Sequence, residues 1–242
     1  MSVLIKAAQT IEVLGASENP TRLSDICDSL DLPKSSVHRL LNELVDLGLV
    51  NKCPDGGYAV GHRLLRWGQY AESYVGLRSL ATPIIRRLRD QTGYTVILAV
   101  PAGPIRTIVA VEPGRTMRPV MLPVGHQGTL GLGASGKILY AYATDQVKEQ
   151  ALQLLSNHER ELLCQPDEFS AIVEQGWASS FGEMEPDVAG VSVPILSRKQ
   201  CVGALVLAGS VENLTLEAMA DVLQPMREVA DHIAREALGS QT

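Results

Sequence analysis

The sequence lacks the features that mark membrane and secreted proteins. No apolar run approaches the roughly 18 consecutive residues of a membrane-spanning helix, and the first residues, MSVLIKAAQT, lack the basic, apolar and small-residue order of a signal peptide. We therefore expect a cytoplasmic protein that makes no contact with a membrane. With 242 residues, 45% of them hydrophobic and 20% charged, the chain has the composition of a globular protein of one or two domains.

Clusters of metal-binding or catalytic residues are also missing. No Cys-x-x-Cys pair occurs among the four widely separated cysteines, so neither a zinc site nor a disulfide framework is indicated, and we expect four reduced, mostly buried thiols: Cys27, Cys53, Cys164 and Cys201. The histidines form no His-x-x-x-His pattern: they are His38, His62, His126, His158 and His232. We therefore expect no metal ion, no cofactor and no catalytic site, and hence a protein that is not an enzyme.

An excess of positive charge, which DNA-binding chains usually show, is absent as well. The net charge is −6, and residues 1–75 contain 7 Lys and Arg against 9 Asp and Glu. A DNA-binding function must therefore rest on local pattern.

Residues 21–50 have the pattern of two helices joined by a tight turn. Ser24 is expected to cap the first helix, and Pro33 suits the first position of the second, which should end near Leu47 before Gly48. An apolar stripe at helical spacing is predicted along the second helix: Val37, Leu40, Leu41, Leu44 and Leu47. With the apolar helix VLIKAAQTIEVL before them, these helices predict a helix-turn-helix bundle.

A hairpin signal follows the bundle. Two short extended runs in LVNKCPDGGYAV flank the sequence PDGG, so the region reads as a winged helix. The exposed side of the second helix and the hairpin offer groups that bind phosphates or base edges: Lys34, Ser35, Ser36, His38, Arg39, Asn42 and Lys52. A solvated helix face without a nucleic-acid partner is the alternative interpretation.

The remaining sequence predicts an α+β domain. After a connecting helix in HRLLRWGQYAESYVG, a helix should run to about Thr92 and end at Gly93. Strand-like runs follow in TVILAV, IRTIVAV, QGWASSFGEM, VAGVSVPIL and CVGALVLAGS, separated by a few helices. A mostly antiparallel sheet with helices packed on it accommodates this order.

Residues 131–138, GLGASGKI, match the first part of a nucleotide-binding P-loop. The motif requires a Ser or Thr after the lysine to hold Mg²⁺, whereas this chain has Ile138. A buried strand should lead into the first glycine, but the approach LPVGHQGT is broken by Pro123, Gly125 and Gly128. The sequence thus argues against a nucleotide site, which stays as a minor alternative.

Two further pairs of residues invite a functional interpretation. Glu183 and Glu185 are two apart, which on a strand places both on one face; we interpret them as local hydrogen-bonding or rim charges rather than an acid-base pair. Trp177 and Phe181 should also share a strand face, and we expect them to pack in the core rather than stack on a ligand.

The chain resembles the IclR family of bacterial transcriptional regulators over nearly its whole length. LPKSSVHRLLNELVDLGLV and the wing ending in YAVGHRLLRWG are similar to that family's DNA-binding region. GWASSFGEMEPDVAGVSVPI resembles its signature region, with Gly176, Ser180, Glu183 and Gly190 at the recurring positions.

The resemblance implies three segments: a winged helix-turn-helix domain over 1–61, a linker helix over 62–76 and a GAF-like effector-binding and oligomerisation domain over 77–242. It also implies a homodimer or homotetramer that binds a palindromic operator in double-stranded DNA and represses or activates transcription under the control of a small molecule. In this family a glycine-containing loop and the following helix wall the effector pocket, so helix amides near Gly133 and Ala134 are expected to face an anion such as a carboxylate. A plain tight approach of the helix to the sheet is the alternative.

The resemblance also indicates what kind of ligand to expect. Family members that bind small hydroxy or keto acids place an Asp, a Cys and two Ser in the pocket, where this chain has Ser180, Gly190, Val206 and Ala208. A less polar and roomier pocket favours an effector with an apolar portion, such as an amino acid, its biosynthetic intermediate or an aromatic acid. A winged-helix module that recognises protein, joined to a ligand-sensing domain, is the alternative function.

Overall fold

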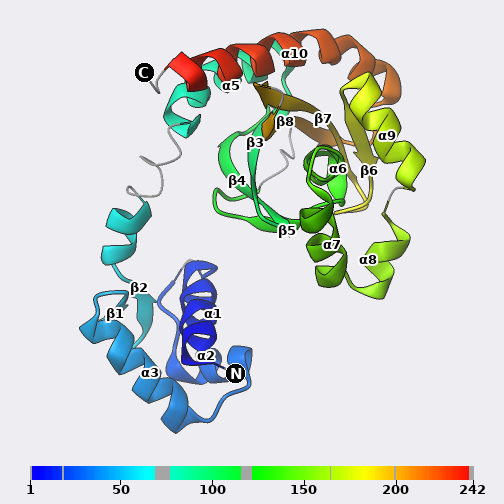
Figure 1. Cartoon of the computed structure of the whole chain (residues 1–242). Helices are drawn as coiled ribbons and strands as arrows, with labels where there is room; N and C mark the ends of the chain where they lie inside the picture. Colours follow the sequence, from blue (N-terminus) through cyan, green and yellow to red (C-terminus); the bar gives the residue numbers. More distant parts are fainter. Residues whose placement is uncertain are drawn as a thin grey trace. The chain divides into compact units, whose positions relative to one another are not determined.

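The computed structural model describes residues 2–17, 19–68, 77–115, 122–163, 165–198 and 200–239 (Figure 1). The chain divides into two compact units, Met1–Val75 and Gly76–Thr242. Within the segment where a linker helix is predicted, residues 63–68 are helical, and residues 69–76 lie outside the described residues. No helix in the described part of the chain is both long and apolar enough to cross a membrane.

The first unit is the winged helix-turn-helix that the sequence predicts. Its elements are α1 (Val3–Gly15), α2 (Leu23–Leu30), α3 (Lys34–Asp46) and the hairpin of β1 (Val50–Lys52) and β2 (Tyr58–Val60). The hairpin is antiparallel, and the segment of residues 54–57 forms the turn that joins its two strands. The helices and the hairpin share one small apolar core, which includes Leu14, Ile26, Val37, Leu41, Leu44, Val50 and Tyr58.

The start of α2 differs from the prediction. Arg22 is the N-cap, and Ser24 lies within the first turn, where its hydroxyl donates to Asp25 Oδ1 at 3.0 Å. The chain is held extended just before this helix because Thr21 exchanges both backbone hydrogen bonds with Tyr58 of the wing. The helix can therefore begin as soon as this pairing ends, and the predicted Ser24 cap is wrong.

The ends of α3 also differ in detail from the prediction. Pro33 is the N-cap rather than the first helical residue. Leu47 is the C-cap and is 50% exposed, so it does not belong to the buried stripe. The helical period no longer governs side-chain direction where the helix ends, and Leu44 is the last residue of the stripe that points inward.

The second unit is built on a six-stranded antiparallel sheet of order β5-β4-β3-β8-β7-β6 (Figure 1). Its strands are β3 (Thr95–Ala102), β4 (Ile105–Glu112), β5 (Gln127–Thr129), β6 (Ala178–Phe181), β7 (Val188–Ser197) and β8 (Gln200–Ser210). Every neighbouring pair is antiparallel. The predicted α+β class and antiparallel sheet are confirmed.

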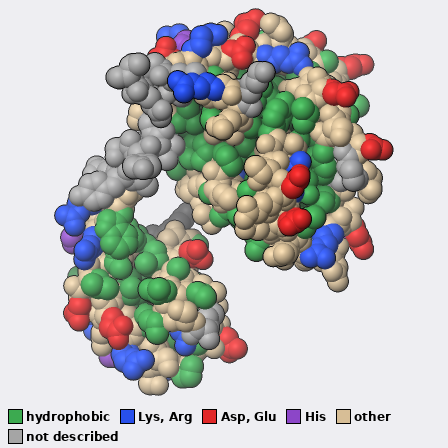
Figure 2. Space-filling model, in the orientation of Figure 1, with side chains coloured by type: hydrophobic (Ala, Val, Ile, Leu, Met, Phe, Trp, Pro, Cys, Tyr) green, Lys and Arg blue, Asp and Glu red, His purple; other side chains and the backbone are tan. Residues whose placement is uncertain are grey.

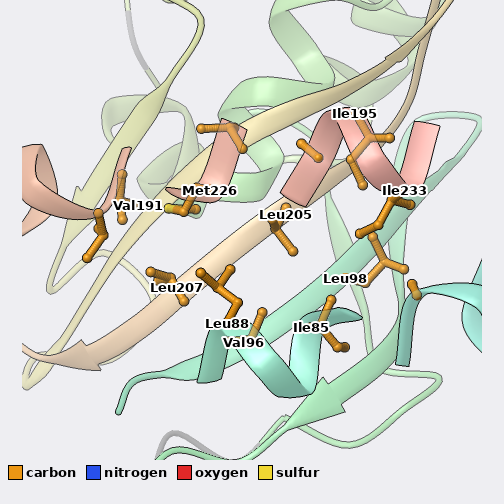
Figure 3. Packing of buried hydrophobic residues seen from close by; sticks show 14 of the residues in the cluster. Ile85, Leu88, Val96, Leu98, Val191, Ile195, Leu205, Leu207, Met226 and Ile233 are labelled. Atoms are coloured by element: carbon orange, nitrogen blue, oxygen red, sulfur yellow. The ribbon is translucent and has the colours of Figure 1, made fainter. Parts of the chain in front are cut away.

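Two helices from opposite ends of this unit cover one face of the sheet. They are α5 (Leu77–Thr92) and α10 (Leu216–Gly239). Figure 3 shows side chains of both helices meeting alternate residues of the strands: Ile85, Leu88, Met226 and Ile233 lie against Val96, Leu98, Val191, Ile195, Leu205 and Leu207. This cluster is the larger of the two cores of the unit.

The other face of the sheet is covered by α6 (Gly133–Ala141), with α9 (Pro166–Gln175) against it. The helices α7 (Asp145–Leu154) and α8 (Asn157–Glu161) lie between them in the chain. Successive strand residues point to opposite faces, so the residues that face α6 are the neighbours of those that face α5 and α10. They form the second core together with α6, and they include Ile97, Ala99, Ile108, Ala204, Val206 and Ala208.

The segment around β6 corrects two predictions. Trp177 precedes the strand and packs against the α5–α10 core, whereas Phe181 at its end is 41% exposed, so only the tryptophan packs as expected. Glu183 and Glu185 lie in the connection to β7, not on a strand. The turn begins directly after Phe181, where Gly182 N donates to Val188 O at 2.8 Å, and the two carboxylates therefore share no strand face.

The described cysteines are free thiols, as the lack of Cys-x-x-Cys pairs predicts. Cys27, Cys53 and Cys201 are each partly rather than fully buried, and Cys164 lies outside the described residues. Burial raises the pKa of the Cys201 thiol to about 11, so this side chain stays protonated at neutral pH.

Candidate functional site

The exposed side of α3 carries most of the side chains that the sequence selects for DNA contacts. Val37, Leu40, Leu41 and Leu44 turn into the core, which leaves the opposite side of the helix in solvent. All seven predicted contacts are exposed, six of them on α3 and one on β1: Lys34, Ser35, Ser36, His38, Arg39, Asn42 and Lys52. An α-helix fits the major groove of B-DNA, so this side of α3 has the form of a recognition surface.

Charges of both signs surround this surface. Acidic and basic side chains are interspersed on the visible face of the unit (Figure 2). Arg39 Nε lies 4.0 Å from Glu43 Oε1 one turn away, and Asn42 Nδ2 lies 3.4 Å from His38 Nδ1. Exposed contacts of this kind contribute little free energy, so DNA can displace them at small cost.

The second unit contains a cavity between the first turn of α6 and the sheet. It holds about 590 Å³ of space between atoms, its open mouth included. All six residues that the sequence selects for effector binding line it: Gly133, Ala134, Ser180, Gly190, Val206 and Ala208. The fold thus brings together residues of α6, β6, β7 and β8, while their contact with an effector stays a prediction.

The start of α6 is occupied by a carboxylate of the chain itself. Gly133 N donates to Glu183 Oε2 at 3.2 Å, and Lys137 Nζ donates to Glu183 Oε1 and, at 3.0 Å, to the carbonyl oxygen of Ser179. Helix N-termini favour negative charge, and here the predicted anion at Gly133 is the side chain of Glu183 rather than a ligand. Glu183 is therefore the partner of α6 and not a rim charge.

The same contacts argue against the nucleotide-binding alternative. A P-loop needs a free lysine that reaches the phosphates. The Lys137 side chain is only 10% exposed and forms an ion pair with Glu183, so the lysine of GLGASGK is not free to contact a phosphate.

The cavity also contains Arg106 of β4, a residue that the motif search missed. Only 4% of Arg106 is exposed, and its Nε donates to Ser135 Oγ on α6 at 2.9 Å. Its Nη1 is buried and has no hydrogen-bond partner among the described residues. Burial lowers the pKa of this guanidinium.

A signal for Arg106 is present in the sequence. Residues 105–108 of β4 alternate in burial, and Arg106 shares its face with Ile108, which packs in the core next to α6. A period of two in IRTIVAV therefore places the arginine on the buried face of the strand. An arginine on a buried face is rare and is a candidate for a functional role.

The rim of the cavity is formed by the connection between β6 and β7. Met184 from this connection lies over Gly133, and both Met184 and Glu185 line the cavity while exposed to solvent. A methionine is flexible and adapts to different neighbours, so the rim can adjust to the shape of a ligand.

A winged helix with an exposed polar recognition helix, followed by an α+β unit with an open cavity, is the architecture of ligand-responsive DNA-binding transcriptional regulators. Two family models match the chain. The model for the IclR helix-turn-helix domain matches residues 3–54, and the model for the C-terminal region of bacterial IclR transcriptional regulators matches residues 69–235. The chain belongs to the IclR family of bacterial transcriptional regulators, and the predicted family is confirmed.

Curated relatives match nearly the whole chain. The glycerol operon regulatory protein of Streptomyces coelicolor is 28% identical over 246 residues, which cover 96% of this chain and 95% of the relative. The DNA-binding transcriptional repressor YiaJ of Escherichia coli is 28% identical over 244 residues, 96% of this chain and 86% of the relative. This chain is accordingly a DNA-binding transcriptional regulator.

Solved structures share the fold along the whole chain. An IclR homologue of Microbacterium hydrocarbonoxydans, crystallised in complex with 4-hydroxybenzoate, is 21% identical with a TM-score of 0.80 and covers 98% of this chain and 100% of its own. The IclR protein of Thermotoga maritima is also 21% identical, with a TM-score of 0.75 and coverage of 97% and 98%. At this level of identity the comparison establishes the fold.

Proposed function

We propose that the cavity of the second unit binds a small-molecule effector and that binding changes the affinity of the winged helix for its operator. The observation that carries this proposal is that the six residues predicted from the sequence, which belong to four elements, all line one cavity. Ligand sites are concave and mostly apolar with a few polar groups, and this cavity has that composition. The proposed function is binding alone, without catalysis.

The proposed effector has an apolar portion and belongs to the amino acids, their biosynthetic intermediates or the aromatic acids. Apolar side chains from three strands face the cavity, among them Ile97, Ile108 and Val206. A very small polar acid would leave the apolar surface of the cavity uncovered, whereas a branched aliphatic or aromatic group would bury it. A neighbour of the same fold that carries 4-hydroxybenzoate supports the inclusion of aromatic acids.

The proposed operator is a palindrome bound by a homodimer or homotetramer, with α3 in the major groove and Lys52 of the wing on a phosphate. The exposure of the seven predicted residues supports this assignment. Two copies on a twofold site would present the same side chains to both half-sites.

A ligand screen followed by operator titrations tests the proposal. Amino acids, their biosynthetic intermediates and aromatic acids are first screened by thermal shift, because a ligand that binds the folded state raises its melting temperature. Each hit is then added to a titration with an operator selected from genomic fragments. The ligand should change operator affinity, and the operator should change ligand affinity by the same factor.

A cavity-filling variant shows whether the response depends on this site. Ala208→Leu places extra carbon atoms in the cavity, and Ala220→Leu adds the same group on an exposed position of α10. We expect Ala208→Leu to lose the ligand response and keep operator binding, while Ala220→Leu keeps both. Gly133 is less suitable for this test because its φ of +66° strains any side chain. A normal ligand response of Ala208→Leu would contradict the proposed site.

A further inference from the structure

Arg106 is a buried cation without an anionic partner among the described residues. Its Nε donates to the neutral hydroxyl of Ser135, and no carboxylate of the described residues pairs with it. The other two buried charged residues among the described ones are matched, since Glu112 binds Arg86 and Lys137 binds Glu183. An arginine stays protonated in proteins, and buried charges are normally paired. The cavity therefore holds one positive charge that no described residue of the chain neutralises.

The sequence leaves space for this guanidinium. Arg106 lies opposite Gly128 in the pairing of β4 with β5, and a Cβ at residue 128 would collide with Arg106 Nη1. On the other side, Arg106 Nη2 comes within 3.8 Å of the position that a Cβ on Gly133 would take, at the wall of the cavity. The planar group is thus held between β5 and the first turn of α6, with its Nε fixed by Ser135.

We propose that Arg106 binds the carboxylate of the effector and is the residue that selects an anionic ligand; this assignment rests on the proposed function of the cavity. A guanidinium offers parallel N–H donors whose geometry matches the two oxygens of a carboxylate. Ile97, Ile108 and Val206 lie on the same face of the sheet and line the cavity, where they contact the apolar body of the ligand. Ser135 is a positioning residue, since it holds the guanidinium through Nε.

Two features restrict the charge of this ligand. The amide of Gly133 already binds Glu183, so this amide does not receive the carboxylate of the ligand. Glu185 at the rim of the cavity repels a second anionic group at that end. The structure therefore favours a monocarboxylate with an apolar body over a dicarboxylate.

Matched pairs of charged and neutral probes test the role of Arg106 in the full-length protein. The probes are benzoate and 4-methylpentanoate, with benzamide and 4-methylpentanamide as uncharged counterparts of the same shape, and affinity is measured by thermal shift and calorimetry. We expect at least one carboxylate to bind about tenfold or more tightly than its amide, the ratio typical of a charge-assisted hydrogen bond in a buried site. Equal affinity of carboxylate and amide would overturn the assignment.

Variants of Arg106 separate charge from packing. Arg106→Met keeps much of the side-chain length and removes the charge. Arg106→Lys keeps the charge but lacks the parallel N–H donors of the guanidinium. The control Arg87→Met removes an arginine charge from an exposed position of α5. We expect Arg106→Met to lose at least about tenfold in carboxylate affinity and to bind the amides as the wild type does. The carboxylate affinity of Arg106→Lys should lie between those of Arg106→Met and the wild type. Arg87→Met should match the wild type. Without ligand, Arg106→Met should melt above the wild type because an unpaired buried charge is gone. Unchanged carboxylate affinity in Arg106→Met, or no stabilisation of the wild type by either carboxylate, would overturn the assignment.

Operator titrations distinguish this assignment from the proposed function. Carboxylate binding that depends on Arg106 but leaves operator affinity unchanged would contradict the proposed function and support the role of Arg106. A neutral ligand that changes operator affinity equally in the wild type and in Arg106→Met would support the proposed function and overturn the role of Arg106.

Discussion

At the scale of single residues, Glu183 joins two parts of the second unit that are far apart in sequence. Its carboxylate receives hydrogen bonds from the first amide of α6 and from Lys137 one turn later. The side chains of Lys137 and Glu183 are only 10% and 17% exposed, so burial has removed most of their hydration. The attraction between the two charges compensates for this loss. This pair holds the β6–β7 connection against the helix that walls the cavity.

Removal of one partner should therefore destabilise the second unit. Lys137→Met leaves the Glu183 carboxylate largely buried with one amide donor, and we expect a loss of about 2–4 kcal/mol in the free energy of unfolding. Urea denaturation followed by circular dichroism measures the change. Arg235→Met, at an exposed position of α10, serves as the control and should stay within about 0.5 kcal/mol of the wild type.

The double variant Lys137→Met with Glu183→Gln distinguishes pairing from simple packing. The neutral amide that replaces the Glu183 carboxylate needs no cation and can still accept from Gly133, so the double variant should recover part of the stability that Lys137→Met loses. If the two changes add independently, the pair does not act as described.

Neither the place of Arg106 in the cavity nor the contacts of Glu183 with α6 were predicted from the sequence, although a signal for Arg106 is present. The alternation of residues 105–108 in β4 is sufficient to place Arg106 on the same face as the buried Ile108, because strand side chains repeat their direction every two residues. The Glu183 contact could not be derived in this way, because residue 183 meets residues 133 and 137 through a turn and a helix end. Neither element imposes a periodic direction on the side chain.

At the scale of elements, α3 offers the sharpest test of the DNA contacts. Arg39 is exposed and close to Glu43, which competes with DNA for its guanidinium. We expect Arg39→Ala to weaken operator binding by about 1–3 kcal/mol if the side chain contacts a base. Glu43→Gln should strengthen binding by about 0.5 kcal/mol, the free energy of an exposed helical ion pair. Fluorescence anisotropy with a labelled operator measures both changes.

The matched control for this element is Arg87→Ala. It removes one arginine from an exposed position of α5, outside the winged helix, and should leave operator affinity unchanged. Equal affinity of Arg39→Ala and the wild type would remove Arg39 from the interface.

The elements themselves were mostly accessible from the sequence. The apolar period in α3, the PDGG turn of the wing and the Val-rich runs of β7 and β8 each appear in the structure as predicted. The errors lie at the ends of helices and strands. Ser24 was predicted as a helix cap from a local signal, whereas Leu47 and Phe181 were predicted to be buried by extending a periodic pattern too far. Pairing with another element, such as that of Thr21 with Tyr58, decides where a helix can begin.

At the scale of the whole molecule, a net charge of −6 means that operator binding relies on a few local cations. Lys34, Arg39 and Lys52 are exposed on the winged helix, so a dimer presents six such groups. If all six contact phosphates, the logarithm of the binding constant should fall linearly with the logarithm of the salt concentration, with a slope of about −5. Anisotropy titrations between low and moderate salt measure this slope.

The variant Lys52→Ala also reports how many copies of the chain bind. A dimer loses two phosphate contacts and its slope should become less negative by about 2, whereas a single bound copy loses one contact and about 1. A slope that is the same in Lys52→Ala and the wild type would show that the wing makes no phosphate contact.

The family, the two-part organisation and most elements could be predicted from the sequence, because they follow from short-range periods, turn residues and motifs that are local in the chain. Through the resemblance to the family it also predicted six of the residues that line the cavity. The pairing of charges around the cavity depends on the three-dimensional fold. Glu183 binds the amide of Gly133 and the ammonium group of Lys137, and Arg106 has no anionic partner among the described residues. Charge matching in a buried site depends on distances between segments that are remote in sequence, and no local pattern contains those distances.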